Sequence, residues 1–100
     1  MTIEPIRLSG MQTQVRVGKE IKAGERAIWP VMRITTLNAG EDRILSIRIA
    51  PLAMLIIEPA GEYAVSFDGV PMKIEAIIEL ASPLRDVLEK AREGRRIKVD

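Results

Sequence analysis

The sequence predicts a small α+β domain, in which a mostly antiparallel sheet of about four or five strands precedes C-terminal helices. Apolar and polar residues alternate over much of residues 12–67, which is typical of strands with one buried face. Over residues 72–94 the apolar period changes to three and four residues, which is typical of amphipathic helix. Residues 95–100 form a basic tail. A chain of 100 residues fits a single domain.

Two extended segments are expected in the first 40 residues. In residues 12–17, every second side chain is apolar or threonine, which indicates a half-buried strand. Residues 26–37 are rich in β-branched side chains but include Pro30, which cannot donate a ladder hydrogen bond. We therefore expect Pro30 at an edge, at a bulge, or with its nitrogen facing outward. The segment between them, GKEIKAGE, predicts a short, tightly turned connection with Ile21 directed inward.

The next two strands follow a hairpin loop, NAGED, over residues 38–42. Within residues 43–50 the apolar residues of one side are Leu45, Ile47 and Ile49. The residues of the other side include Ser46 and Arg48. The run LAMLII, residues 52–57, is apolar on both faces, so we expect a central strand there. A turn at residues 58–61 then leads to a partner strand in which Tyr63, Val65 and Phe67 alternate.

The C-terminal third predicts either one kinked helix or two short helices. The residues of its apolar stripe are Ile74, Ile77, Ala81, Leu84, Leu88 and Ala91. Ser82 and Pro83 suit the start of a second helix, and Gly94 suits its end. Residues 72–80 also alternate as a strand would, but the apolar Ile77 and the continuity with the next helix favour a helix. Since the tail lies beyond Gly94, we expect its removal to leave fold and assembly intact.

The amino-acid composition excludes several kinds of active site. The chain has no cysteine and no histidine, so it has no disulfide, thiolate nucleophile, zinc-binding thiolate or imidazole base. The remaining acid–base candidates, Glu41–Asp42 and Glu58 with Glu62, flank turns, where carboxylates are normally solvated. We therefore expect no catalytic residue, no metal site and no cofactor, and keep an enzyme with a carboxylate-based site only as an alternative.

The number of apolar stripes indicates self-association. A compact monomer of 11.1 kDa exposes about 5,700 Å² of surface. Three sets of apolar side chains have to be buried: both faces of residues 52–57, the stripe of residues 43–50 and the helical stripe. A second copy is the simplest cover, so we expect a homo-oligomer, most simply a two-fold dimer. The interface candidates are Trp29, Ile47 and Leu55, although Trp29 is better explained as a core residue.

A nucleic-acid partner is the main alternative. The candidate contacts are the basic residues Arg92, Arg95, Arg96 and Lys98. Acidic residues interleave this cluster, the net charge is only +1, and three aromatic residues are too few for a stacking platform. The leading prediction is therefore a non-enzymatic protein that acts by self-association or by binding an unidentified protein.

We expect the protein to be cytoplasmic. The apolar run of residues 52–57 is too short to span a membrane, and the first ten residues lack the pattern of a signal peptide. Abundant isoleucine, glutamate and arginine, with only three side-chain amides, favour a thermophilic source.

One region is similar to a known family. Its matching positions are Gly18, Ile21, Gly24, Ile28, Pro30, Val31, Pro51 and the strand that begins at Leu52. In this order, residues 17–67 resemble the GerW family, also called YtfJ-type spore proteins. The long glycine-rich span of that family is missing here, where only Gly40 remains. The resemblance implies no catalytic residues, and we carry over no role in spores.

Overall fold

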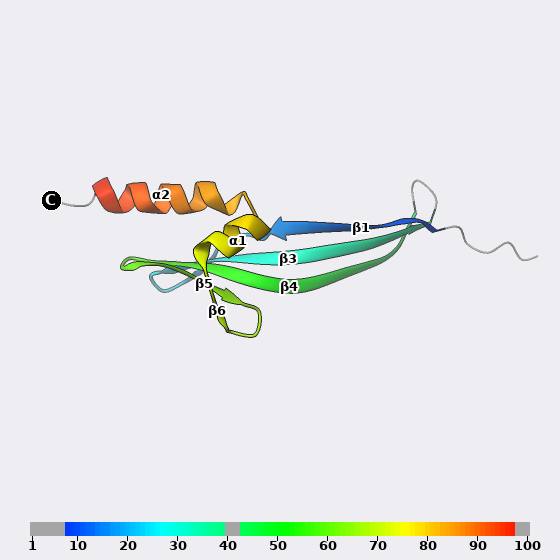
Figure 1. Ribbon diagram of the computed structural model, residues 1–100, viewed down its shortest axis with the longest axis horizontal. Coiled ribbons are helices and arrows are strands. Elements are labelled where there is room, and N and C mark those ends of the chain that lie inside the picture. The colour runs from blue at the N-terminus through cyan, green and yellow to red at the C-terminus, as the bar shows by residue number, and fades with distance from the viewer. Residues whose placement is uncertain (1–7, 40–42, 98–100) are drawn as a thin grey trace, which may run out of the picture.

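The computed structural model describes residues 8–39 and 43–97, and it has the predicted α+β architecture (Figure 1). A six-stranded sheet has the order β1-β3-β4-β5-β6, with β2 also pairing with β3, and every pairing is antiparallel. Its strands are β1 (Leu8–Val17), β2 (Ile21–Ala23), β3 (Arg26–Ala39), β4 (Ile44–Glu58), β5 (Gly61–Ser66) and β6 (Pro71–Met72). Two helices follow, α1 (Ile74–Leu80) and α2 (Leu84–Ile97).

Pro30 lies in an interior strand, at a position where no neighbouring strand needs a hydrogen bond from its nitrogen. On one side of β3, β1 ends at Val17 and β2 begins at Ile21, so Pro30 faces the gap between these strands. The backbone N–H of Gly18 donates to the carbonyl of Pro30 at 2.8 Å. The expectation that the proline nitrogen avoids the ladder is therefore confirmed.

The hydrophobic core lies between α1, α2 and one face of the sheet, at the end of the molecule that we call the head. Its fully buried residues are Val31, Leu55, Ile77 and Leu84. Val31 and Leu55 come from neighbouring strands, and Ile77 and Leu84 come from the two helices. The helical stripe thus covers the sheet, as its period of three and four residues predicts.

The helical region differs from the prediction at its end. Residues 74–80 are helical, which decides against a strand, and the chain breaks at Ser82 and Pro83 before α2. The predicted stop at Gly94 is wrong, because α2 continues to Ile97. Gly94 does not have the positive φ of a helix-ending glycine. Part of the predicted basic tail is therefore helical, and residues 98–100 lie outside the described residues.

The sheet extends well beyond the head as an elongated three-stranded arm (Figure 1). We define the arm as residues 10–16 of β1, 32–39 of β3 and 43–52 at the start of β4. β5 pairs with β4 only from Ala53 to Glu58. Alongside the part of β4 before Ala53, the sheet therefore consists of only three strands, β1, β3 and β4. Fifteen residues of β4 span about 50 Å at the usual rise per residue, which is why this strand reaches far past the helices.

The connection between β1 and β3 does not have the predicted side-chain arrangement. A turn follows β2, and Gly24 supplies the positive φ of 64° that it needs. Ile21, which was expected to point inward, is 52% exposed. Ile21 pairs with Ile28 on the face of β3 that no described helix covers, so the inward prediction is wrong.

Candidate interaction surface

The two faces of the sheet can be followed from head to arm through the strand register. Val31, opposite Ala53, belongs to the face that packs under the helices, which we call the helix-side face. The alternate residues of β3, beginning with Pro30 opposite Met54, form the other face, which we call the outer face. In β4 a register irregularity at Leu52 shifts the alternation by one residue, so Pro51 follows Met54 on the outer face. No described helix lies over the outer face.

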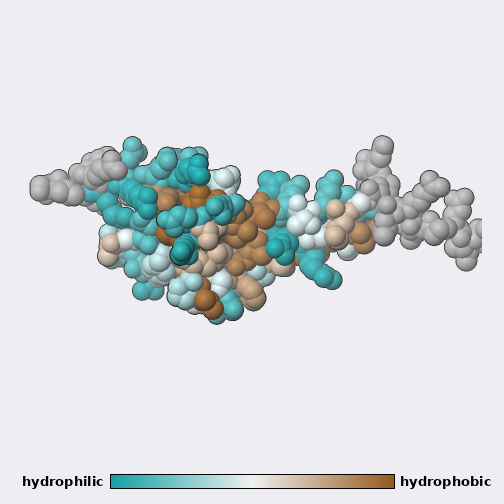
Figure 2. Space-filling model, viewed as in Figure 1, coloured by the Kyte–Doolittle hydropathy of each residue, from teal (hydrophilic) through white to brown (hydrophobic). Residues whose placement is uncertain are grey.

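On the outer face, β3 and β4 contribute mainly apolar side chains, whereas β1 contributes Gln12, Gln14 and Arg16. In β3 its residues include Ile28, Pro30, Met32 and Ile34. In β4 its residues include Ile47, Ile49, Pro51, Met54 and Ile56. Hydrophobic side chains are also visible at the surface where the arm leaves the head and again further along the arm (Figure 2). The predicted alternation is confirmed for residues 46–49, with Ile47 and Ile49 on one side and Ser46 and Arg48 on the other. It is wrong for Leu45, because a register irregularity there pairs Ile44 instead with Asn38.

The apolar side chains of the arm are strongly exposed. Ile47 is 59% exposed and Ile49 is 60% exposed, and in the same strand Ile44 is 59% exposed and Leu45 is 43% exposed. Soluble monomers rarely leave contiguous apolar patches of more than a few hundred Å² in water. The described part of the chain therefore has an apolar surface for which it provides no cover.

The arm also has an open backbone edge. From Ile44 to Pro51, no described strand pairs with the edge of β4 that faces away from β3. At the head end of this edge, the N–H of Phe67 donates to the carbonyl of Leu52 at 3.0 Å, and β5 pairs with the strand from Ala53 onward. Unpaired N–H and C=O groups along a strand are a template for another strand.

The helix-side face of the arm has two arginines, beside the apolar Met11, Val15 and Leu37. Arg48 lies opposite Thr35, which lies opposite Thr13, and Arg33 lies in the next row. Both arginines are exposed, and neither forms an ion pair with another described side chain. The two arginines and Ile47 thus lie on opposite faces of the arm.

At the other end of the molecule, a charge cluster joins α2 to β5. The carboxylate of Glu62 lies 2.8 Å from Arg92 Nε and 2.5 Å from Arg95 Nη2. Burial is the largest single influence on Glu62 and raises its pKa, but the hydrogen bonds and charges of Arg92 and Arg95 together outweigh it. The pKa of Glu62 is therefore held below its ordinary value. The two arginines fix the last turns of α2 to the sheet.

A second cluster lies at the end of the β4–β5 hairpin. The hydroxyl of Tyr63 donates to Glu58 Oε1 at 3.0 Å, and Arg26 Nε lies 2.7 Å from the same oxygen. The hydrogen bond to Glu58 is the main reason why the pKa of Tyr63 is raised. Glu58 and Glu62, the alternative acid–base pair, are thus each engaged with arginine.

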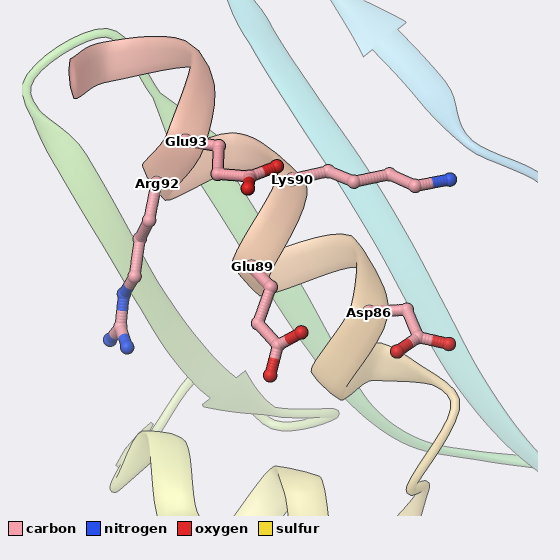
Figure 3. Close-up of a pocket in the computed structure, with 5 residues that line it drawn as sticks. All are labelled: Asp86, Glu89, Lys90, Arg92 and Glu93. Atoms are coloured by element: carbon pink, nitrogen blue, oxygen red, sulfur yellow. The ribbon is translucent and has the colours of Figure 1, made fainter. Parts of the chain in front are cut away.

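The predicted nucleic-acid contacts are not brought together as a free cationic surface. Arg92 and Arg95 both pair with Glu62. The backbone of Arg96 is helical but its side chain, like the whole of Lys98, lies outside the described residues. A surface hollow on the exposed side of α2 is lined by Asp86, Glu89, Lys90, Arg92 and Glu93. The charged ends of Lys90 and Arg92 extend to opposite sides of this hollow (Figure 3).

The three interface candidates have different positions. Ile47 is exposed on the outer face of the arm. Leu55 is fully buried beneath the helices, so it is a core residue and the expectation that it lies at an interface is wrong. Trp29 is half-buried and packs against the same core, and its indole N–H is buried without an acceptor among the described residues. Sequence reasoning missed the open edge of β4, because alternation does not report where a neighbouring strand ends.

The described residues suggest no other kind of site. Glu41 and Asp42 lie outside them. Within residues 8–39 and 43–97, no three acidic side chains gather as metal ligands. No helix in the same ranges has the length and apolar character needed to cross a membrane.

Comparisons with protein-family models, with curated proteins and with solved structures give no match. The resemblance to the GerW family therefore stays a prediction.

Proposed function

We propose that this protein acts by self-association, and that a second copy covers the apolar outer face of its arm. The observation that carries the proposal is the exposure of Ile47 and Ile49, on a face that no described helix or strand covers. Under this proposal the protein is not an enzyme, and its function is to assemble with further copies of itself.

A second copy is favoured over an unrelated partner for two reasons. The same apolar surface is present on every copy at the same concentration, and two apolar surfaces are complementary to each other without matched charges.

The test compares two charge substitutions at neighbouring positions of one strand. Ile47→Glu places a carboxylate on the outer face, and Ser46→Glu places the same charge on the helix-side face. We expect Ile47→Glu to shift the protein to monomer at micromolar concentration, and Ser46→Glu to leave assembly unchanged, as measured by sedimentation velocity.

Two results would contradict the proposal: a wild-type protein that is monomeric, or an Ile47→Glu variant that assembles as well as Ser46→Glu. Since Ile47 lies outside the core, both variants should keep the wild-type circular dichroism spectrum. This control separates loss of assembly from loss of fold.

A nucleic-acid partner is the second candidate, and the observation that favours it is the pair of exposed arginines, Arg33 and Arg48, on the helix-side face of the arm. Binding to duplex DNA that weakens steeply with salt, and that is lost in an Arg33→Gln/Arg48→Gln variant, would support it. The absence of binding at low salt would exclude it.

A further inference from the structure

We infer that the helix-side face of the arm has a binding site for a phosphate monoester, between Arg33 and Arg48. The phosphate group would lie over Thr35, and the organic part of the ligand would lie over Met11 and Leu37. The inference goes beyond the proposed self-association, which uses the opposite face of the arm.

Positive charge is concentrated in the strands of the arm. The segments that define the arm contain four arginines and no aspartate or glutamate, whereas the net charge of the whole chain is only +1. In the head, Arg26, Arg92 and Arg95 each form an ion pair with a glutamate. No arginine of the arm forms an ion pair with another described side chain, and the acidic residues of the loop between β3 and β4 lie outside the described residues. The arm therefore has cationic groups that are available to bind an anion.

Arg33 and Arg48 can reach the same ligand. Arg33 lies opposite Ala50, two residues along β4 from Arg48, and Arg48 lies opposite Thr35. Diagonal neighbours of this kind are about 7–8 Å apart, a distance that two long side chains can span. Two guanidinium groups at this separation repel each other, so an anion between them stabilises both. Each group can also donate two parallel hydrogen bonds to a phosphate.

A surface hollow surrounds the two arginines. Its volume is about 540 Å³, and none of the described residues that line it is acidic. Thr13 and Thr35 also line it and lie opposite each other in neighbouring strands, so their hydroxyl groups add two hydrogen-bond donors. A phosphate monoester has three strong acceptor oxygens and a charge of about −1.5 to −2 at pH 7, so it matches these donors better than a carboxylate does.

One end of the hollow is apolar. Met11 and Leu37, which also line it, lie opposite each other in the row next to Thr13 and Thr35. Met11 is 69% exposed, so it has surface that a ligand can cover. Covering apolar surface is favourable, so an organic group attached to the phosphate would add affinity that inorganic phosphate lacks.

A small ligand suits this face better than a nucleic acid. Duplex DNA is bound through many phosphate contacts along its backbone, and the affinity depends on their number. This face offers one pair of arginines in one hollow, beside the exposed apolar Met11 and Val15. The hollow therefore fits a single phosphate group.

Phenyl phosphate and inorganic phosphate are suitable probes, because they share the phosphate group and differ in the apolar part. Each is titrated into the full chain at low ionic strength by isothermal titration calorimetry, since salt screens exposed charges. We expect both probes to bind, and phenyl phosphate to bind several-fold more tightly. Met11→Ala should reduce this preference for phenyl phosphate and should leave the affinity for inorganic phosphate unchanged.

Two matched double variants separate the site from the net charge of the arm. Arg33→Gln/Arg48→Gln removes both arginines of the hollow and should weaken the binding of both probes about ten-fold or more. Arg16→Gln/Arg43→Gln removes two charges from the same arm, but neither of these residues lines the hollow. It should therefore bind both probes within about two-fold of wild type. All four arginines are exposed, so both variants should keep the wild-type circular dichroism spectrum.

Three results would overturn the inference. The first is that neither probe binds at millimolar concentration, and duplex DNA that binds in their place would assign this face to a nucleic acid. The second is that both double variants weaken binding equally, which would mean attraction by net charge alone. The third is that Met11→Ala leaves the preference for phenyl phosphate unchanged. A failure of self-association is a separate result, because Ile47→Glu changes the opposite face and should bind phenyl phosphate as the wild type does.

Discussion

Arg95 Nη2 lies 2.5 Å from Glu62 Oε2, and this contact joins the last turn of α2 to β5. The same Arg95 Nη2 lies 3.5 Å from the backbone carbonyl of Glu58. The Glu62 side chain is only 10% exposed, so its charge depends on these partners rather than on water. The arginines that sequence reasoning assigned to a nucleic acid are thus used within the fold.

Replacing Glu62 should destabilise the protein in a pH-dependent way. We expect Glu62→Gln to lower the free energy of unfolding by about 1–2 kcal/mol at pH 7, since Arg92 and Arg95 are both partly exposed. Because the pKa of Glu62 is lowered in the folded state, its contribution is complete above the ordinary value of 4.5 and is lost as pH falls through the folded value. Urea unfolding at several pH values should show the variant and wild type converging below pH 4.5. A constant difference would contradict this account.

Two truncations should differ in stability. Removing residues 95–100 deletes Arg95, and we expect the melting temperature to fall by several degrees, since 1 kcal/mol corresponds to about 4–8 °C in a domain of this size. Removing only residues 98–100 keeps both contacts of Arg95 and should leave the melting temperature unchanged. This replaces the expectation that the whole tail is dispensable. Equal melting temperatures for the two truncations would show that Arg95 has no such role.

Tyr63 should titrate above an ordinary tyrosine. Its hydrogen bond to Glu58 raises the pKa, and the phenolate would also face the charge of that carboxylate. The chain has a single tyrosine, so ultraviolet absorbance reports on this group alone. We expect Glu58→Gln to lower the apparent pKa of Tyr63 relative to wild type. An unchanged titration would mean that Glu58 does not hold the hydroxyl in solution.

Gly18 should not accept a side chain. A Cβ at this position would lie 2.9 Å from Pro30 Cγ and 3.1 Å from Met32 Cε. The proline ring cannot rotate away, so we expect Gly18→Ala to cost about 1–3 kcal/mol of unfolding free energy, measured by chemical denaturation. Gly94→Ala is a suitable control, because that Cβ meets no atom within 4 Å and the residue is helical. A stabilised Gly94→Ala beside a destabilised Gly18→Ala is the expected pattern.

Leu55 and Ile47 should separate folding from assembly. Leu55→Ala removes part of a fully buried side chain and should cost about 2–5 kcal/mol of stability. Ile47→Ala, on the exposed arm, should hardly change the stability of the monomer and should weaken assembly. Thermal unfolding at two protein concentrations distinguishes these effects, because only assembly makes the melting temperature depend on concentration. A large loss of monomer stability in Ile47→Ala would contradict the description of the arm.

The features that could be predicted from the sequence are those that depend on local periodicity. The alternation around Ile47 identifies which side chains share a face, and the spacing from Ile74 onward identifies a helix, because both patterns follow from backbone geometry. The break at Ser82–Pro83 follows from the missing donor of proline.

The remaining features depend on contacts between distant residues. Periodicity does not show that Leu55 lies under the helices while Ile47, on the same strand, lies beyond them. It does not show that Gly94 continues a helix, since the contact of Arg95 with Glu62 that anchors the last turns joins residues far apart in the chain. The open edge of β4 exists because β5 begins to pair only at Ala53, and no local pattern marks that point.

The measurement that tests the central claim most directly is sedimentation equilibrium of the unmodified chain at micromolar concentration. Self-association through the arm predicts a mass of at least twice the 11.1 kDa of one chain. A mass of 11.1 kDa across the whole concentration range would contradict it, and would mean that the apolar outer face stays in water.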